Sequence, residues 1–565
     1  MIIIALLLLN AGIVANSPPI FSTTPIHHPV TSTNGMVATQ EALATRVGID
    51  ILKQGGNAID AAVAIGFALA VTYPQAGNLG GGGFMMIHLA SSNTTIALDF
   101  RETAPAKAHR DLFLDNNNNN VDHQKARFSV LSSGVPGSVH GLLTALNKYG
   151  TMPRKHVMAP AIAFAKKGII VSQHLSKSLK KAQSRLSNDP TMGPIFYPNK
   201  QAPFAGDKLV QRDLASTLKR ISKKGIAGFY AGQTATAIGS FMAKNNGLIT
   251  SDDLINYTSK ERAPIHIEYH GHDIYSMPLP SSGGIVMAQL LKLIEPYPLN
   301  KWGHNSAATM HVMSEAMALA YADRAEWLGD DDHVTVPKKQ LLSPSYVQAR
   351  RRTINQNQHT PSEGITHGTP YESDETTHYS VVDQWGNAVS VTTTLNFSYG
   401  SGIGVPGTGI LLNNEMDDFS AKPGVPNAYG LIGNENNAIA PNKRMLSSMA
   451  PTIVLKNQEL FLVTGSPGGS RIISTVAQII SNVIDHNMTI AEATHAPRFH
   501  HQWWPDELRI EANGFSTDTL TLLRAMGHRV STKRAMGATQ SIMKVNGHWH
   551  GASDPRSPSG LTLGH

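Results

Sequence analysis

The alternation of β-branched and polar positions is clearest in two neighbouring runs, residues 377–382 and 388–394, which a short turn with glycine and asparagine joins. This pattern predicts a β-hairpin. If the pairing is symmetric about Trp385, Thr376 lies directly opposite Thr394. Cross-strand partners share one face of a sheet, so a hydroxyl from Thr394 would lie within reach of the Thr376 hydroxyl.

Helical patterns and further strands precede this hairpin. Residues 36–54 and 58–71 predict two helices, the first stopped by two glycines and the second capped by Asn57. The apolar runs 84–89 and 95–100 predict strands. We find no long linker and no internal repeat, so the sequence predicts one intertwined α/β unit rather than separate modules.

Two glycine-rich stretches differ in context. Residues 77–83 follow a predicted helix and lack the Lys-Ser/Thr ending of a phosphate-binding loop, so we expect close backbone packing there. Residues 466–470 follow a predicted strand, 459–464, and open a predicted helix, 471–486. Backbone N–H groups at such a helix start suit a developing oxyanion. A plain glycine turn before a helix is the alternative.

Thr376 is a candidate nucleophile. A threonine hydroxyl alone is weak, but if cleavage made Thr376 a chain terminus, its own α-amine would take the proton from Oγ. Such an amine has an ordinary pKa of about 7.7–8.0, which suits a general base near neutral pH. The same residues are also typical of an ordinary strand, because threonine and tyrosine favour strands.

The composition restricts the chemistry. The 565 residues include no cysteine, which excludes thiol nucleophiles, zinc–thiolate sites and disulfides. The net charge is +7, but the basic residues are scattered, so we expect no nucleic-acid partner. The 25 histidines form no His-Glu-x-x-His motif, and their densest group is His495, His500 and His501. We therefore predict no metal site and no cofactor.

The N-terminus carries an apolar run, residues 2–9, that is too short to span a bilayer but typical of a secretory signal. No Lys or Arg precedes the run, so an uncleaved anchor and a misassigned start codon remain alternatives. We predict a signal peptide over residues 1–15 and a periplasmic or secreted protein. No other stretch predicts a membrane span.

Five segments resemble the gamma-glutamyltransferases (gamma-glutamyltranspeptidases), in that family's order and spacing. The segments are 98–102 (LDFRE), 376–383 (TTHYSVVD), 411–419 (LLNNEMDDF), 441–449 (PNKRMLSSM) and 465–471 (GSPGGSR). The resemblance covers residues 39–555 and implies the four-layer αββα sandwich of N-terminal nucleophile hydrolases. In this family a precursor cleaves itself, which implies a scissile Glu375–Thr376 bond, a large subunit 16–375 and a small subunit 376–565.

The resemblance also implies the roles of single residues. Thr376 is the nucleophile, Thr394 orients its hydroxyl, and the backbone N–H groups of Gly468 and Gly469 form an oxyanion hole. The residues that would bind the donor are Arg101, Ser447 and Ser448 at its α-carboxylate, Asn396, Glu415 and Asp418 at its α-amine, and Tyr429 on a lid loop. Bacterial members often have Gln where Glu415 stands, so this chain would carry one more negative charge.

These roles imply a self-processing γ-glutamyltransferase and glutathione hydrolase. Thr376 would take the γ-glutamyl group from glutathione or another γ-glutamyl amide and transfer it to water or to an acceptor amino acid or peptide. The expected partners are these small molecules and the other subunit. A glutaryl (cephalosporin) acylase of the same superfamily is the nearest alternative, although its substrate lacks an α-amine. An exported binding protein that never matures is an alternative from another class, and a poly-γ-glutamate depolymerase is disfavoured by the lid.

Overall fold

The computed structural model describes residues 27–115, 117, 120–364, 376–428 and 430–565. The predicted signal peptide, Glu375 and Tyr429 lie outside the described residues. None of the helices within these ranges is long and apolar enough to cross a bilayer.

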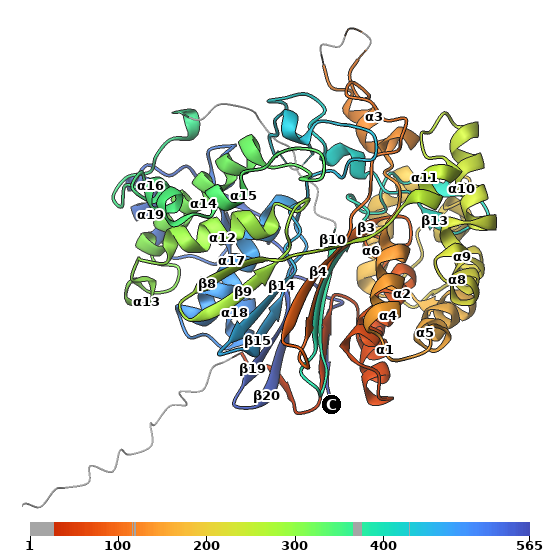
Figure 1. Ribbon diagram of the computed structural model, residues 1–565, viewed down its shortest axis with the longest axis horizontal. Helices are drawn as coiled ribbons and strands as arrows, with labels where there is room; N and C mark the ends of the chain where they lie inside the picture. Colours follow the sequence, from red (N-terminus) through yellow and green to blue (C-terminus); the bar gives the residue numbers. More distant parts are fainter. Residues whose placement is uncertain (1–26, 116, 118–119, 365–375, 429) are drawn as a thin grey trace, which may run out of the picture.

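Two antiparallel sheets of seven strands each form the centre of the molecule (Figure 1). The first sheet has the order β1 (Val30–Ser32), β20 (His548–Ser553), β19 (Gln540–Val545), β15 (Glu459–Thr464), β14 (Thr452–Lys456), β9 (His272–Ser276) and β8 (Ile265–Tyr269). The second has the order β21 (Leu561–Gly564), β2 (Met36–Thr39), β10 (Thr376–Val382), β11 (Ala388–Thr394), β3 (Gly82–Leu89), β4 (Thr94–Phe100) and β7 (Lys260–Arg262). Each sheet combines strands from before and after Thr376.

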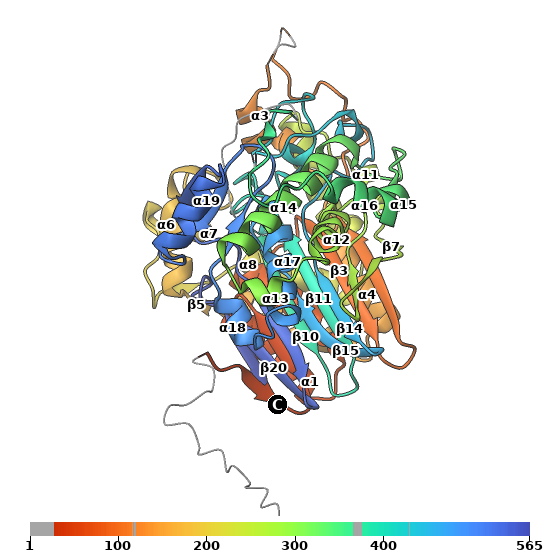
Figure 2. The ribbon, with the colours of Figure 1, turned by 90° about the vertical axis from the view of Figure 1, so that its left-hand side faces the viewer.

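Helices cover the outer face of each sheet. The second sheet is covered by α1 (Ala42–Lys53), α2 (Ala58–Thr72), α4 (Ser138–Tyr149), α5 (Arg154–Lys167) and α8 (Arg212–Lys224). The first is covered by α12 (Gly283–Ile294), α14 (Ala307–Trp327), α17 (Ile472–Ile484) and α18 (Ile490–His495), which lie in front of its strands in Figure 2. The layers therefore follow the order helix, sheet, sheet, helix, which confirms the αββα prediction.

The remaining elements surround this sandwich. The helices are α3 (His123–Phe128), α6 (Gln173–Leu186), α7 (Gly193–Phe196), α9 (Ala227–Tyr230), α10 (Gly232–Lys244), α11 (Ser251–Asn256), α13 (Leu299–Trp302), α15 (Lys338–Leu341), α16 (Pro344–Arg351) and α19 (Thr517–Ala525). The short strands are β5 (Ile169–Ile170), β6 (Lys208–Leu209), β12 (Gly404–Val405), β13 (Ile410–Leu411), β16 (Phe499–His500), β17 (Leu508–Glu511) and β18 (Val530–Lys533).

The predicted hairpin is present with the predicted register. Strands β10 and β11 pair so that Thr376 lies opposite Thr394. Both strands are buried along their whole length, since one face packs on helices and the other on a second sheet. Tyr379 and Val381 join the apolar core beneath α2, while the alternate residues face the first sheet.

The predicted helix over residues 36–54 was wrong at its start. Met36–Thr39 forms strand β2, which pairs with β10, and helix α1 begins only at Ala42. All four strand residues are buried. A short apolar run buried on both faces does not distinguish a strand from a helix, so tertiary pairing decides the outcome.

The other predicted elements of this region are confirmed. Helix α2 carries a capping box at Asn57, as the sequence indicated. Strands β3 and β4 occupy the two predicted apolar runs. The glycine loop before β3 packs closely on backbone, because a Cβ at Gly81 would lie 2.0 Å from the carbonyl oxygen of Thr394.

Candidate active site

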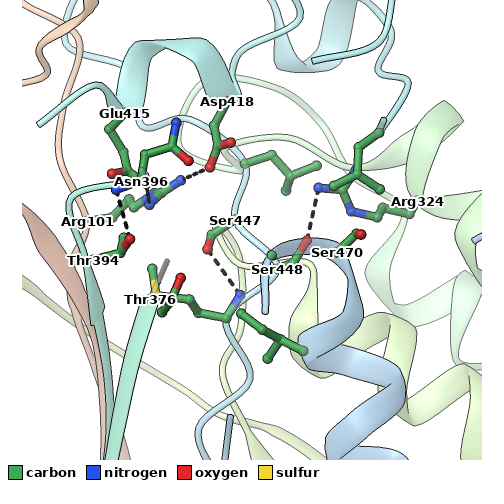
Figure 3. A pocket seen from close by; sticks show the side chains of 15 residues that line it. Arg101, Arg324, Thr376, Thr394, Asn396, Glu415, Asp418, Ser447, Ser448 and Ser470 are labelled. Atoms are coloured by element: carbon green, nitrogen blue, oxygen red, sulfur yellow. Dashed lines mark hydrogen bonds and ion pairs between the residues drawn. The ribbon is translucent and has the colours of Figure 1, made fainter. Parts of the chain in front are cut away.

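Thr376 lies at the head of β10, 6% exposed, and lines a pocket whose other walls come from distant parts of the chain (Figure 3). Nearly all the predicted site residues meet there. Those that line the pocket with Thr376 are Arg101, Thr394, Asn396, Glu415, Asp418, Ser447, Ser448 and Gly469. The fold thus brings together residues that are separated by up to several hundred positions in the sequence.

The inward face of the hairpin carries a polar row between the two sheets. Nδ1 of His378 lies 2.9 Å from Oγ1 of Thr392, and the Ser390 hydroxyl donates to the carbonyl of Thr464 over 2.9 Å. Burial lowers the pKa of His378 to about 3, so its ring is neutral near pH 7. His378 therefore supports the strand by hydrogen bonding and carries no charge beneath Thr376.

The end of β11 is fixed beside the pocket. The Thr394 hydroxyl accepts a hydrogen bond of 2.8 Å from the backbone N–H of Asn396. Asn396 has a φ of 74°, a left-handed conformation that asparagine tolerates better than most residues. Its side-chain amide donates to the carbonyl of Asn414 over 2.9 Å. These contacts connect Thr394, the cross-strand partner of Thr376, to the segment that carries Glu415.

A buried charge cluster forms one wall of the pocket. Arg101, at the end of β4, is ion-paired with Glu415 and, at 2.5 Å, with Asp418, both on the short helix η4 (Glu415–Asp418). Glu102 lies 3.7 Å from the same guanidinium. Burial raises the pKa of all three carboxyl groups, that of Glu102 to about 7, and Arg101 opposes the shift. Three acids around one guanidinium favour an additional cation.

A serine pair and a second arginine form the opposite wall. The Ser447 hydroxyl accepts from the backbone N–H of Met449 over 3.1 Å, and that of Ser448 lies 3.5 Å from a guanidinium nitrogen of Arg324. Nε of Arg324 also donates to the Ser282 hydroxyl over 2.9 Å. Burial lowers the pKa of Arg324 to about 10, which still leaves it charged at neutral pH.

Sequence reasoning missed Arg324. The residue lines the pocket, is 4% exposed and comes from the long helix α14. Its signal in the sequence is weak, because it is only a lone arginine in an Ala- and Met-rich stretch. A buried arginine needs polar partners. The serines that provide such partners are distant in the chain, so the sequence alone did not indicate them.

The two predicted oxyanion glycines adjoin Thr376 from two sides. Gly469, the first residue of η6 (Gly469–Arg471), lines the main pocket, and Gly468 lines a neighbouring hollow that also reaches Thr376. Their φ values are 55° and 129°, where side chains are strained. The structure therefore places the glycine turn next to the candidate nucleophile.

The neighbours of Tyr429 contact the acidic side of the pocket. The Asn427 amide lies 3.4 Å from Oδ1 of Asp418, and the backbone N–H of Ala428 donates to Asp417 over 3.2 Å. The carbonyl of Gly430 accepts from Gln502 over 3.4 Å. The chain on both sides of Tyr429 is thus hydrogen-bonded near the site, and the lid role of Tyr429 stays a prediction.

Groups with the spacing of metal ligands lie away from this pocket. Within the described ranges they are His311, Glu315 and His528; His359, His501 and Asp506; and Asp330, Asp331 and Asp332. Two of the three aspartates, Asp331 and Asp332, are already paired with Arg262 or Lys338. None of these groups lines the Thr376 pocket.

Comparison with known proteins gives a consistent result. The sequence pattern of the family Gamma-glutamyltranspeptidase matches residues 44–563. The chain is 55% identical over 544 residues to the glutathione hydrolase proenzyme of Escherichia coli (strain K12), covering 96% of this chain and 93% of that protein.

Solved structures agree with the fold. A cephalosporin acylase from Bacillus halodurans superposes with a TM-score of 0.84 at 28% identity, over 98% of this chain and 99% of that one. Gamma-glutamyltranspeptidase from Helicobacter pylori gives 0.56 at 41% identity, over 62% of this chain and 97% of that one. With the fold, the pocket and the full-length match in agreement, the chain belongs to the gamma-glutamyltranspeptidase family.

Proposed function

We propose that this protein is a self-processing γ-glutamyltransferase that hydrolyses glutathione and related γ-glutamyl amides, with Thr376 as nucleophile. One observation carries the proposal. Thr376 and Thr394, which both carry hydroxyl groups, line a pocket, and one wall of that pocket holds Arg101 among three carboxyl groups. A γ-glutamyl group presents a carboxylate and an ammonium at its far end, which match this mixed charge.

Maturation begins in the precursor. Oγ of Thr376 attacks the carbonyl carbon of Glu375, and the peptide nitrogen leaves as the α-amine of Thr376, which gives an ester. Water then hydrolyses the ester, so Glu375 ends in a carboxylate and Thr376 regains its hydroxyl. The products are the proposed large subunit, residues 16–375, and small subunit, residues 376–565.

Turnover uses the new terminus. The α-amine of Thr376 takes the proton from Oγ as the oxygen attacks the γ-carbonyl of the donor. The N–H groups of Gly468 and Gly469 stabilise the oxyanion, and one such donor typically contributes about 3–4 kcal/mol. The amine product leaves with the proton, and water or an acceptor amine then attacks the γ-glutamyl ester.

Donor binding exchanges ion pairs. The donor carboxylate takes a share of the Arg101 guanidinium, whose planar fork suits two-point pairing, and Ser447 and Ser448 add hydroxyl donors. The donor ammonium pairs with the carboxylates of Glu415 and Asp418 and donates a hydrogen bond to the Asn396 side chain. Arg324 positions Ser448 through the contact described above.

The substrate of a glutaryl acylase would interact differently with the pocket wall that carries Arg101, Glu415 and Asp418. A glutaryl group has a terminal carboxylate but no ammonium, so it would leave Glu415 and Asp418 without a cation in exchange. The acid cluster therefore favours a glutamyl donor. The full-length match to a proenzyme argues against a binding protein that never matures.

Three anilides test the proposal. γ-Glutamyl anilide carries both charged groups, glutaryl anilide lacks the ammonium, and 4-aminobutyryl anilide lacks the carboxylate. We expect kcat/KM for the first to exceed both others by about 100-fold or more, as for the loss of a charged hydrogen bond at a buried site. Preference for the glutaryl compound would support the acylase function instead.

Export completes the proposal. The apolar run at residues 2–9 indicates a signal peptide over residues 1–15 and a periplasmic or secreted enzyme. Its partners are then small extracellular γ-glutamyl compounds and acceptor amino acids or peptides. Cell fractionation with mass analysis of the mature N-terminus tests this, and retention in the cytoplasm with residue 1 intact would contradict it.

A further inference from the structure

Outside the Thr376 pocket, a buried group of titratable side chains lies between α14 and the segment after α19. It contains four histidines and two acids, all but one almost fully buried. The members are His311, Glu315, His359, His501, Asp506 and His528, of which Asp506 is the most exposed. The proposed catalytic cycle uses none of them.

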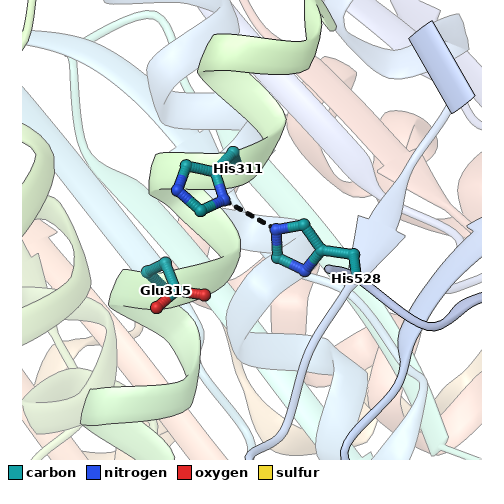
Figure 4. A group of neighbouring side chains, drawn as sticks. All are labelled: His311, Glu315 and His528. Carbon is teal, nitrogen blue, oxygen red and sulfur yellow. Dashed lines mark hydrogen bonds between the residues drawn. The ribbon is translucent and has the colours of Figure 1, made fainter. Parts of the chain in front are cut away.

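Three of these side chains converge on one point (Figure 4). His311 and Glu315 are four residues apart on α14, so one helix face presents both. His528 faces them from the segment after α19. One ligand atom from each of the three residues lies within 4.8 Å of the others, whereas ligands of one tetrahedral zinc ion, bound at about 2.0–2.1 Å, lie about 3.3 Å apart. Small side-chain rotations would bring the three to that spacing.

The hydrogen bonds of this group leave one imidazole nitrogen without a partner. Nε2 of His311 lies 2.7 Å from the carbonyl oxygen of Asn355, so this nitrogen is the donor and Nδ1 carries a lone pair. Nδ1 of His311 faces Nε2 of His528 at 2.7 Å, which makes His528 the donor there. Nδ1 of His528 then carries the one unused lone pair of the two rings, in a residue that is only 3% exposed. Among the described residues it has no hydrogen-bond partner.

Nδ1 of His311 and Nε2 of His528 face each other beside Glu315, and once the His528 proton moves from Nε2 to the unpartnered Nδ1, both nitrogens can bind one ion. Two imidazole nitrogens beside a carboxylate are the ligand set that Zn²⁺ and similar ions prefer. The carbonyl of Asn355 holds the ring of His311 in the way that outer-shell acceptors orient metal-bound histidines. Glu315 is likewise held, by Nδ1 of His359 at 2.6 Å and the backbone N–H of Thr360 at 3.1 Å. The arrangement therefore has both inner ligands and supporting contacts.

We propose that His311, Glu315 and His528 bind a divalent transition-metal ion, with Zn²⁺ the best match. The three ligands are at most 3% exposed, and one position of a tetrahedral ion would remain for a water molecule. His311 and Glu315 precede Thr376 in the chain, and His528 follows it. The ion therefore joins the two subunits across the cleavage point and stabilises the mature pair.

The test uses the full-length mature protein. After treatment with a chelator, the protein is incubated with Zn²⁺, desalted and analysed for metal, and its Tm is measured with and without zinc. We expect about one zinc per chain and a Tm that rises by a few degrees. Cobalt in place of zinc should give the visible d–d bands of a tetrahedral site without thiolate bands.

Three variants locate the ion. His528→Gln and Glu315→Gln should each weaken zinc retention at least about 10-fold. His304→Gln is the matched control, because His304 stacks edge-on against another histidine, His486, at 5.4 Å between ring centroids, and should retain zinc. Absence of zinc and of any Tm change in the wild type overturns the proposal, even if a variant fails to fold. Equal retention by all three variants also overturns it.

Discussion

Thr376 and Thr394 are direct cross-strand partners in β10 and β11, with their side chains on the face that lines the pocket. The Thr394 hydroxyl is itself positioned by the backbone N–H of Asn396. The partner of the nucleophile is therefore fixed by backbone before any donor binds. From this arrangement we propose that Thr394 has a positioning role in both maturation and turnover.

Thr394→Ala is expected to slow both reactions. Loss of one positioned hydroxyl, worth about 1–3 kcal/mol, corresponds to a decrease of about 10- to 100-fold in the rate of cleavage and in kcat. Thr394→Ser keeps the hydroxyl and should retain most of both rates. The measurements are a time course of precursor cleavage by gel and anilide kinetics.

Thr377→Val serves as the control for that experiment. Thr377 neighbours the nucleophile but points to the opposite face of β10, and its hydroxyl has no hydrogen-bond partner within the described ranges. Its replacement should leave both rates within about twofold of wild type. A loss equal to that of Thr394→Ala would mean that the strand, and not the hydroxyl, is responsible.

Asp418→Asn tests ammonium recognition. The change removes one negative charge beside Arg101, so KM for γ-glutamyl anilide should rise by about 10- to 100-fold. Glutaryl anilide has no ammonium, and its kcat/KM should stay the same or improve. An equal decrease in kcat/KM for both substrates would show that Asp418 supports the fold of the pocket and does not recognise the donor ammonium.

Much of the fold and most of the site followed from the sequence, for identifiable reasons. The hairpin was predictable because alternation and turn residues are local, and the register then placed Thr394 opposite Thr376. The strand β2 was missed because its apolar run is buried on both faces. Arg324 and the ion pair of Arg101 with Glu415, 314 positions away, depend on tertiary contacts that no local pattern encodes.

Glu102 gives the protein a predictable pH dependence. Burial raises its pKa from 4.5 to about 7 in the folded protein, so the folded state binds more protons than the unfolded state between these values. The free energy of unfolding should therefore fall as pH rises from 4.5 to 7. Glu102→Gln removes this contribution and should flatten the decline.

Denaturant unfolding at pH 5 and pH 7 measures that effect. Both proteins carry Thr376→Ala, so that each remains one uncut chain, and all other titrating groups are common to the pair. The free energy of unfolding of the protein with Glu102, minus that of the Glu102→Gln variant, should be larger at pH 5 than at pH 7. An equal difference at the two pH values would place the pKa of Glu102 outside this window.

Tyr429→Ala addresses the lid. Asn427 and Ala428, which precede Tyr429, are hydrogen-bonded to Asp418 and Asp417, so we expect the loop to affect donor binding and not the Glu375–Thr376 bond. We expect normal cleavage with KM for small donors changed by about threefold or more. Unchanged kinetics for γ-glutamyl anilide would count against a lid role.

The most direct test of the account is the intact mass and N-terminal sequence of the purified protein, wild type beside Thr376→Ala. We predict that the wild type gives two chains, the smaller beginning at Thr376, and releases amine from γ-glutamyl anilide. The variant should remain one chain without activity. An uncut but active wild type, or cleavage that persists in Thr376→Ala, would contradict the assignment of Thr376 as nucleophile.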